Sequence, residues 1–247
     1  MNKKVLIIHP HDKSTSFLER IRNYLSFELQ NSVHYFNIKP NELSHNECLK
    51  VIKDFPSSGL VLFMGHGRSN CLYGAVGDDY GTMPSEDAIL EHPDRYFSNE
   101  NYINLENVGV FREKKVIALT CNSNDQIGRE AIRSGAKVFL GFGNLPTSIE
   151  ELKEEGEQEK RGLSLSTVEK ALKSEINYVI KKSIVIGITK NHSFGELMNV
   201  IWFVTNQRIS DYLVNKKTIS ERKVIANYLY RFKREIKIHG DKSIKLT

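Results

Sequence analysis

Cysteine and proline are scarce in this sequence, and long apolar runs are missing. The 247 residues include six prolines, one tryptophan and only three cysteines, which are Cys48, Cys71 and Cys121. An odd number of cysteines without metal-ligand spacing argues against a disulfide framework and against a metal site. Free thiols are typical of a reducing compartment, so we expect a cytoplasmic protein that holds no metal.

The apolar runs are too short for a membrane segment. The first one, Val5-Leu6-Ile7-Ile8, has four residues and ends at His9-Pro10. A secretory signal needs a longer apolar core, and a membrane span needs roughly 18 apolar residues. The sequence therefore predicts neither a signal peptide nor a membrane partner.

Charge is unevenly distributed around a net value of +5. Residues 216–247 carry ten Lys or Arg and three Asp or Glu, whereas residues 150–160 carry six Glu and two Lys. The basic segment could bind nucleic acid or an acidic protein. The alternative is the solvated face of a terminal helix, which is favoured because no base-reading motif accompanies the charge.

Continuous apolar runs alternate with helical patterns over the first 145 residues. Such runs are typical of strands that are covered on both faces, and their alternation with helices predicts a mainly parallel sheet between helices. We therefore expect an α/β fold. The expected strands are Lys4–Ile8, Val33–Phe36, Leu60–Met64, Val116–Thr120 and Lys137–Phe142.

Helix starts are predicted from capping boxes, in which a hydroxyl and a carboxylate three residues later satisfy the first free amides of a helix. A further helix is expected over Asp125–Ser134, ended by Gly135. The run Ser183–Ile188 is ambiguous between helix and strand. The boxes are Ser16-x-x-Glu19, Ser44-x-x-Glu47, Ser166-x-x-Glu169, Ser193-x-x-Glu196 and Thr218-x-x-Glu221.

Composition divides the chain into three regions. Residues 1–146 form the expected α/β core, and residues 147–163 are acidic and read as an exposed loop or a charged helix. Residues 164–247 are expected to be helical, to complete or flank the core, and to end in a basic helix.

Two of the expected strands are followed directly by residues whose side chains can take part in catalysis. Leu60–Met64 is followed by Gly65-His66-Gly67, and Val116–Thr120 is followed by Cys121-Asn122-Ser123. Ligands of open parallel sheets bind beyond the carboxyl ends of the strands. If the two strands are neighbours, His66 and Cys121 face each other there.

A thiol and an imidazole suit nucleophilic catalysis at such an edge. A free thiol is only a few per cent ionised at neutral pH, and the start of a helix just after Cys121 would lower its pKa, as would a nearby imidazole. Histidine can take up the thiol proton and protonate a leaving amine. The amides of Gly67 and Cys121 could together hold an oxyanion.

These motifs resemble the caspase-like cysteine peptidases, and most closely the bacterial CHAT-type domains. In that family an apolar strand ends in His-Gly, and about 50 residues later another ends in the nucleophilic Cys. Here Cys121 follows His66 by 55 residues. A helix, a Gly-Ala step and a strand come next, as in Gly135-Ala136 and Val138–Gly141. The resemblance covers residues 60–146 well and the C-terminal hundred residues not at all.

The resemblance implies a caspase-like three-layer sandwich whose catalytic core is residues 1–146. It implies a cysteine endopeptidase that needs no cofactor, with His66 and Cys121 as the catalytic dyad and the amides of Gly67 and Cys121 as the oxyanion hole. It also implies a regulated bacterial effector in defence or cell death, with a specific protein substrate and an activating protein partner.

Substrate specificity stays open at this point. Metacaspase-like members carry an acidic residue two positions before the Cys, where this chain has Leu119. Asp78, Asp79 and Asp125 are candidates for binding a basic substrate side chain, whereas Arg68 would suit an acidic one.

The remaining motifs favour structural roles or less specific functions. His9 and His11 are expected in a loop, and Cys48 and Cys71 are expected to be structural. The step Lys160-Arg161-Gly162 is a candidate for self-cleavage at Arg161.

Two other functions compete with the peptidase. One is a non-catalytic caspase-fold module that binds a protein or nucleic acid. The other is a nucleotide-binding domain, for which Gly141-Phe142-Gly143-Asn144 offers only an incomplete phosphate-binding fingerprint.

Overall fold

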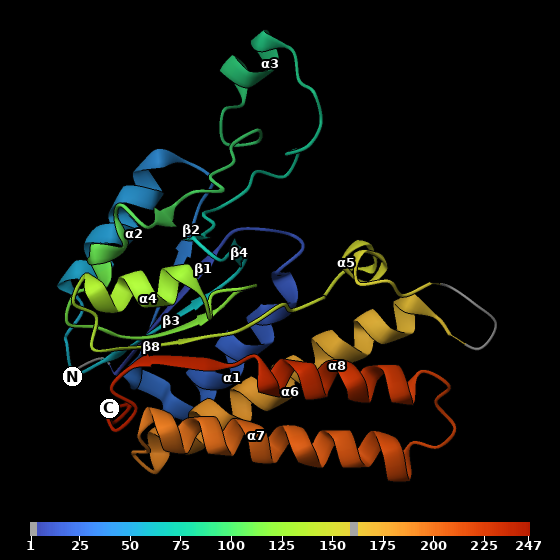
Figure 1. The fold of residues 1–247 in the computed structure, drawn as a ribbon. Helices are drawn as coiled ribbons and strands as arrows, with labels where there is room; N and C mark the ends of the chain where they lie inside the picture. The colour runs from blue at the N-terminus through green and yellow to red at the C-terminus, as the bar shows by residue number, and fades with distance from the viewer. Residues whose placement is uncertain (1–3, 159–162) are drawn as a thin grey trace.

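A six-stranded, mostly parallel sheet forms the centre of the protein (Figure 1). The computed structural model describes residues 4–158 and 163–247. The strand order is β2-β1-β3-β7-β8-β9, and every neighbouring pair is parallel except β8 and β9. The strands are β1 (Val5–Pro10), β2 (Val33–Ile38), β3 (Leu60–Met64), β7 (Lys115–Leu119), β8 (Val138–Gly141) and β9 (Lys237–Gly240).

Helices cover both faces of this sheet (Figure 1). One face packs against α1 (Glu19–Leu29), α6 (Leu165–Thr189), α7 (Phe194–Ser210) and α8 (Arg222–Arg234). The other face packs against α2 (Glu42–Asp54) and α4 (Gln126–Arg133), together with the short turn η3 (Val108–Phe111). Further short helical elements are η1 (Ser16–Leu18), η2 (Gln30–Ser32), α3 (Glu86–Glu91), α5 (Ile149–Glu154) and the π-helical turn η4 (Asp211–Asn215).

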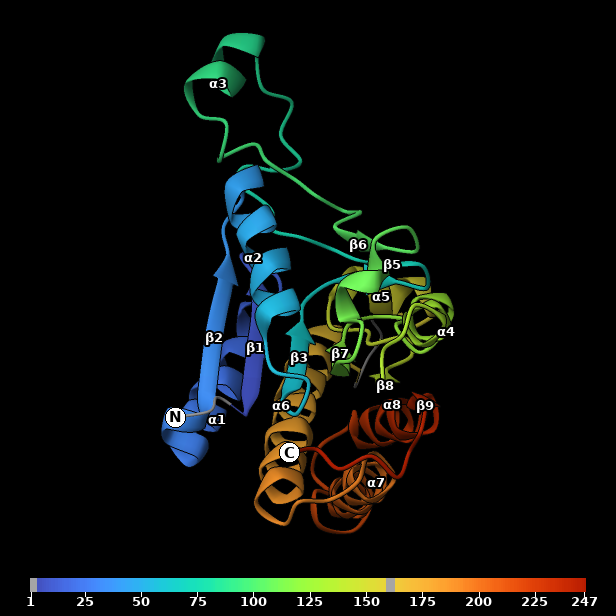
Figure 2. The same cartoon turned by 90° about the vertical axis from the view of Figure 1, so that its left-hand side faces the viewer.

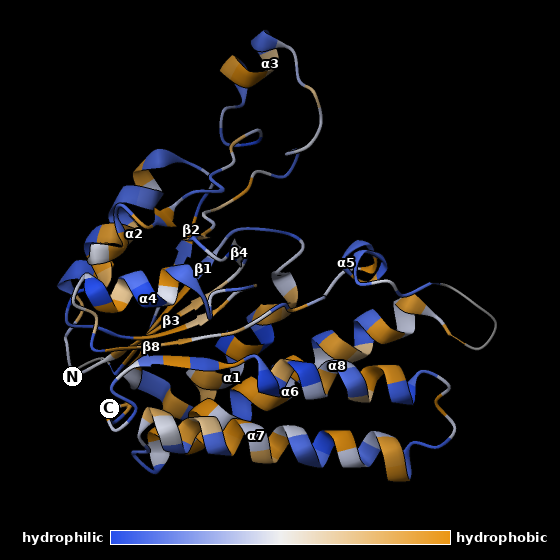
Figure 3. Cartoon of the chain, viewed as in Figure 1, coloured by the Kyte–Doolittle hydropathy of each residue, from blue (hydrophilic) through white to orange (hydrophobic). Residues whose placement is uncertain are grey.

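Strand side chains alternate between two apolar cores, because successive residues of a strand point to opposite faces. Leu60 and Leu62 of β3 belong to the core beneath α1, α6 and α7, whereas Val61 and Phe63 belong to the core beneath α2 and α4. The central strands are correspondingly mostly apolar, and β3 is apolar along its whole length (Figure 3). The predicted α/β class is confirmed, and the layering is compatible with a three-layer sandwich.

A long excursion follows β3 before the chain returns to the sheet in β7. It contains a small three-stranded sheet of β4 (Gly67–Arg68), β5 (Cys71–Leu72) and β6 (Ile103–Asn104). The segment around α3 extends away from the sheet beyond α2 in both views (Figures 1 and 2). The sequence analysis predicted no strand in this excursion.

The five strands predicted from apolar runs are confirmed, with ends that differ by at most two residues. Of the capping boxes, only that of Ser193 forms; Ser16, Ser44, Ser166 and Thr218 do not cap a helix. Better-placed residues take over: Asn41 accepts from the Ser44 amide at the start of α2, and Ser164 accepts from the Thr167 amide at the start of α6. An unpredicted capping box, Ser148 with Glu151, starts α5.

The C-terminal region is helical as predicted, but it does not end in a helix. The ambiguous run Ser183–Ile188 lies within α6. After α8, the chain enters β9 and completes the sheet beside β8. In the acidic segment, residues 149–154 form the short helix α5 rather than a loop, and Leu152 is fully buried.

The candidate self-cleavage residue Arg161 lies outside the described residues. Among the helices that the structure describes, none is long and apolar enough to cross a membrane.

Candidate functional site

The two predicted strand ends are neighbours. Strands β3 and β7 pair in parallel, with Met64 opposite Leu119. His66 and Cys121 each lie two residues beyond this pair, so both emerge at the same edge of the sheet. The position is one where parallel sheets bind ligands.

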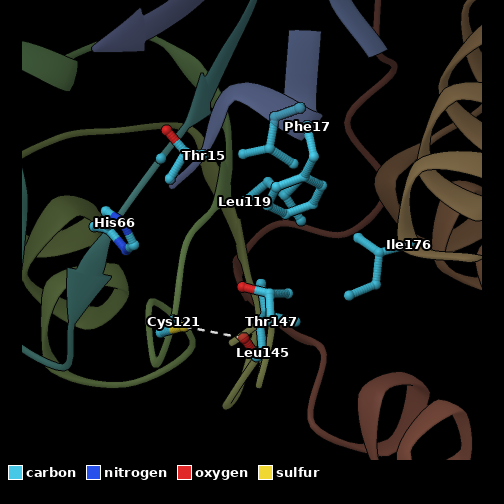
Figure 4. Close-up of a pocket in the computed structure, with 10 residues that line it drawn as sticks. Thr15, Phe17, His66, Leu119, Cys121, Leu145, Thr147 and Ile176 are labelled. Atoms are coloured by element: carbon cyan, nitrogen blue, oxygen red, sulfur yellow. Dashed lines mark hydrogen bonds between the residues drawn. The ribbon is translucent and has the colours of Figure 1, made fainter. Parts of the chain in front are cut away.

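His66 and Cys121 line one hollow, whose enclosed part measures only about 20 Å³ and which reaches about 330 Å³ only when the open space at its mouth is included. Figure 4 shows His66 and Cys121 on one side of this hollow and Ile176 of α6 on the opposite side. Its lining residues are Thr15, Phe17, Leu18, Gly65, His66, Leu119, Cys121, Leu145, Thr147 and Ile176.

The imidazole of His66 is held by two residues that follow β1. Its Nε2 lies 2.6 Å from the Ser14 hydroxyl oxygen and 3.6 Å from a carboxylate oxygen of Asp12. The Ser14 hydroxyl in turn donates to Asp12 at 2.5 Å. Because Ser14 uses its proton on Asp12, it accepts the proton on His66 Nε2. This assigns Nδ1 as the nitrogen that is left to act as a base.

The thiol of Cys121 is protonated in this state. Burial, with a smaller contribution from the Glu151 carboxylate, raises the pKa of Cys121 to about 11. The thiol donates to the Leu145 carbonyl at 3.7 Å (dashed in Figure 4). The expectation that a helix start lowers this pKa is wrong, because α4 begins at Gln126, five residues after Cys121.

The two backbone amides that were expected to hold an oxyanion, those of Gly67 and Cys121, lie on neighbouring turns. Tyr73 donates its amide to the His66 carbonyl, so Gly67 occupies a non-hydrogen-bonded position in the β4–β5 pairing and its N–H points away from β5. A Cβ at Gly67 would lie 2.8 Å from the Thr120 hydroxyl, which shows how closely Gly67 approaches the Cys121 turn. Within the described part of the chain, the Cys121 amide has no acceptor.

The charged specificity candidates lie away from the hollow, and each has a partner of its own. Arg68 donates to the Cys71 sulfur at 3.2 Å. Asp78 pairs with His11 at 3.3 Å and Asp79 pairs with Arg95. Asp125 pairs with Arg129 at 2.8 Å. None of the four lines the hollow.

Of the other histidines and cysteines considered in the sequence, His9 differs from its prediction, whereas Cys48 and Cys71 agree with theirs. His9 is part of β1 and buried, so its prediction as a loop residue is wrong. Burial lowers the pKa of His9 to about 4, and its Nε2 lies 3.2 Å from the hydroxyl of Thr15, which lines the hollow. Cys48 and Cys71 are fully buried core residues, as predicted.

Sequence reasoning missed Asp12 and Ser14. Both follow the first strand at the sheet edge that also holds His66, and that position was the signal that could have found them. Over the residues that the structure describes, no group of three or more His, Cys, Asp or Glu side chains could hold a metal ion.

Comparisons with models of known protein families, with curated proteins and with solved structures find no match. The geometry of the site and the resemblance of its motifs therefore carry the functional argument.

Proposed function

We propose that this protein is a cysteine endopeptidase of the caspase-like type, with Cys121 as the nucleophile and His66 as the proton-transfer base. The observation that carries the proposal is that one hollow is lined by both groups, delivered by the adjacent strands β3 and β7. A nucleophile, a base and a third group that orients the base form the usual arrangement of covalent catalysis. Asp12, acting with Ser14, is that third group here.

In the proposed reaction, the Cys121 sulfur attacks the carbonyl carbon of the scissile peptide bond while His66 accepts the thiol proton. The amides of Gly67 and Cys121 donate to the oxygen that becomes negative. His66 then transfers the proton to the leaving amine as the C–N bond breaks, which leaves a thioester on Cys121. Water attacks this thioester, His66 takes the proton of the water, and the proton returns to the released thiol.

The neutral thiol restricts how this reaction can start. With a Cys121 pKa of about 11, a preformed thiolate–imidazolium pair is not the resting state. In this proposal, deprotonation by His66 therefore accompanies the attack on the substrate carbonyl, as in a serine hydrolase rather than a papain-like enzyme.

The biological role follows from the resemblance. The proposal places the protein among regulated bacterial effectors of defence or cell death that act in the cytoplasm. It includes a specific protein substrate and an activating protein partner.

The second candidate is a non-catalytic caspase-fold module that binds a protein or nucleic acid. The observation in its favour is the same buried, protonated thiol, since a Cys without thiolate character is a small apolar residue. The basic C-terminal segment gives this alternative little support at the positions where its cations already contact other residues of the protein. Arg231 pairs with Glu155 at 2.8 Å, and Lys233 donates to Asn206 at 2.5 Å.

A peptidyl electrophile tests the peptidase proposal. We expect it to modify the protein covalently at one site, as seen in the intact mass, and to lose this reaction in Cys121→Ala and His66→Ala. Cys48→Ala is the matched control, since Cys48 is also a free thiol but lies fully buried in the core beneath α2. Modification that persists in Cys121→Ala, or no modification of the original protein, would favour the non-catalytic module.

A further inference from the structure

The hollow beside Cys121 has an uncharged lining. Among its ten residues, His66 is the only ionisable side chain apart from the thiol itself. Five of the others are large and apolar: Phe17, Leu18, Leu119, Leu145 and Ile176. A substrate side chain that enters the hollow would lose its contacts with water and contact mainly apolar side chains.

A charged substrate side chain would lose its hydration in this hollow without gaining a partner. Removal of an unpaired ion from water is strongly unfavourable, whereas burial of an aliphatic side chain is favourable. The acidic and basic residues that could have supplied partners lie elsewhere and are paired, as described above.

Glu151 is one acid to be considered, because it contributes to the raised pKa of Cys121. Its carboxylate does not line the hollow, and it accepts hydrogen bonds from the amides of Thr147 at 2.7 Å and Ser148 at 2.9 Å. These bonds fix the start of α5, so Glu151 already has a structural role and is not a free partner for a substrate cation.

The apolar surroundings continue behind the hollow. A second, nearly closed space, of which about 10 Å³ is enclosed, shares Leu145 and Ile176 with the hollow and extends toward Leu172 and Phe232. None of the residues that line this second space is charged. Because Leu145 and Ile176 line both spaces, movement of these two side chains would lengthen the hollow without exposing it to a charge.

We propose that this hollow binds the side chain of the residue whose carbonyl Cys121 attacks, and that it selects an uncharged aliphatic side chain such as Leu or Met. The inference rests on the proposed peptidase function, and it names the substrate class of the same site. Ile176, on the wall opposite the dyad, sets the size of the side chain that is accepted (Figure 4).

A positional set of peptidyl electrophiles tests the inference. The probes carry Leu, Met, Phe, Lys or Asp next to the electrophile and a mixture of residues at the preceding positions. The rate of Cys121 modification is read from the intact mass. We expect the Leu and Met probes to react at least about tenfold faster than the Lys and Asp probes, because the hollow can desolvate an apolar side chain but cannot pair a charge.

Ile176→Ala is expected to change the selectivity rather than the chemistry. The shortened side chain enlarges the hollow, so the Phe to Leu rate ratio should rise by about tenfold. Ile180→Ala is the matched control: Ile180 is buried in the same core one turn along α6 but does not line the hollow. Its Phe to Leu ratio should stay unchanged, and thermal unfolding shows whether both variants fold.

The outcomes separate this inference from the function on which it rests. Faster modification of Cys121 by the Lys or Asp probe would overturn the apolar selectivity and leave the peptidase standing. An equal shift in selectivity in Ile176→Ala and Ile180→Ala would remove the role of Ile176. No reaction of Cys121 with any peptidyl probe, in a protein whose Cys121 still reacts with iodoacetamide, would overturn both.

Discussion

A histidine works as a directed base only when one of its ring nitrogens is held. In His66 the held nitrogen is Nε2, fixed by Ser14 at 2.6 Å and by Asp12 at 3.6 Å. In the proposed reaction, the partly exposed Asp12 carboxylate also faces the positive charge that His66 acquires when it accepts the thiol proton. We therefore propose that Asp12 is a positioning residue whose charge stabilises the imidazolium.

Asp12→Asn tests this role because it keeps the shape and removes the charge. We expect the rate of Cys121 modification by a peptidyl electrophile to fall by about 100-fold, an effect between that of removing a residue that orients a metal ligand and that of removing a buried triad acid. The melting temperature should hardly change. Asp78→Asn, an exposed carboxylate paired with His11, is the control and should retain the rate. An unchanged rate in Asp12→Asn would mean that His66 does not need the Asp12 carboxylate for this reaction.

The protonated thiol of Cys121 gives a prediction of pH dependence. Since its pKa is about 11, the thiolate fraction rises with pH throughout the accessible range. Alkylation of Cys121 by iodoacetamide should therefore accelerate about tenfold per pH unit between about pH 7 and pH 9, without a plateau. It should also be about 100-fold slower than alkylation of a cysteine in an unstructured peptide. A plateau near neutral pH would indicate a thiolate paired with His66.

At the scale of elements, the turn after β7 is clamped against β8. Asn122 donates its amide to the Gly143 carbonyl, and Asn124 donates its amide to the Phe142 carbonyl. Asn122 itself has a positive φ of 55°, a backbone conformation that asparagine tolerates better than most residues. The turn therefore presents Cys121 from a rigid base rather than from a loose loop.

Gly141→Ala should break this clamp. An added Cβ would lie 2.3 Å from the Ser123 carbonyl oxygen and 2.6 Å from the Asn124 nitrogen, and these backbone atoms cannot move independently of the turn. We expect a loss of about 1–3 kcal/mol in unfolding free energy and slower Cys121 modification. Gly109→Ala is the control, because its Cβ would meet no atom closer than the Ser134 Cβ at 4.0 Å. Urea denaturation measures both, and equal stabilities would refute the clamp.

The same elements show what the sequence could reveal. Runs such as Leu60–Met64 are local signals, since a strand buried on both faces must be continuously apolar. By contrast, β9 is short and reads Lys237-Ile238-His239-Gly240, so only its long-range pairing with β8 makes it a strand. Asp12 and Ser14 were missed for the same reason, because 52 residues separate Ser14 from His66.

At the scale of the whole molecule, the two apolar cores on either side of the sheet make the fold one unit. Strand β1 contributes to both cores, with Val5 and Ile7 on one face and Leu6 and Ile8 on the other. His9 continues this buried strand and is only 3% exposed. Its protonation therefore affects the stability of the fold as a whole.

The lowered pKa of His9 predicts acid sensitivity. The unfolded chain takes up a proton at a pKa near 6.5, whereas folded His9 does so only at about 4. Below pH 6.5 the unfolded state thus binds more protons, and stability falls until about pH 4 by about 3 kcal/mol. Urea denaturation at several pH values should show that His9→Gln loses less unfolding free energy between pH 6.5 and pH 4, by about this amount. His34→Gln, a change in the edge strand β2, should retain the full loss, and equal losses in both variants would contradict the assignment.

The late position of Glu235, which follows α8 directly, has a consequence for synthesis. The side chain of Asn124, in the turn that follows Cys121, donates to the Glu235 carbonyl at 2.5 Å, and the Glu235 carboxylate accepts from the Asn144 amide at 3.0 Å. A chain that is still emerging from the ribosome lacks these contacts until Glu235 has left the exit tunnel. Cys121, the proposed nucleophile, therefore gains this support only after the chain has grown 111 residues past Asn124, and a translation product truncated before Glu235 would carry His66 and Cys121 without it.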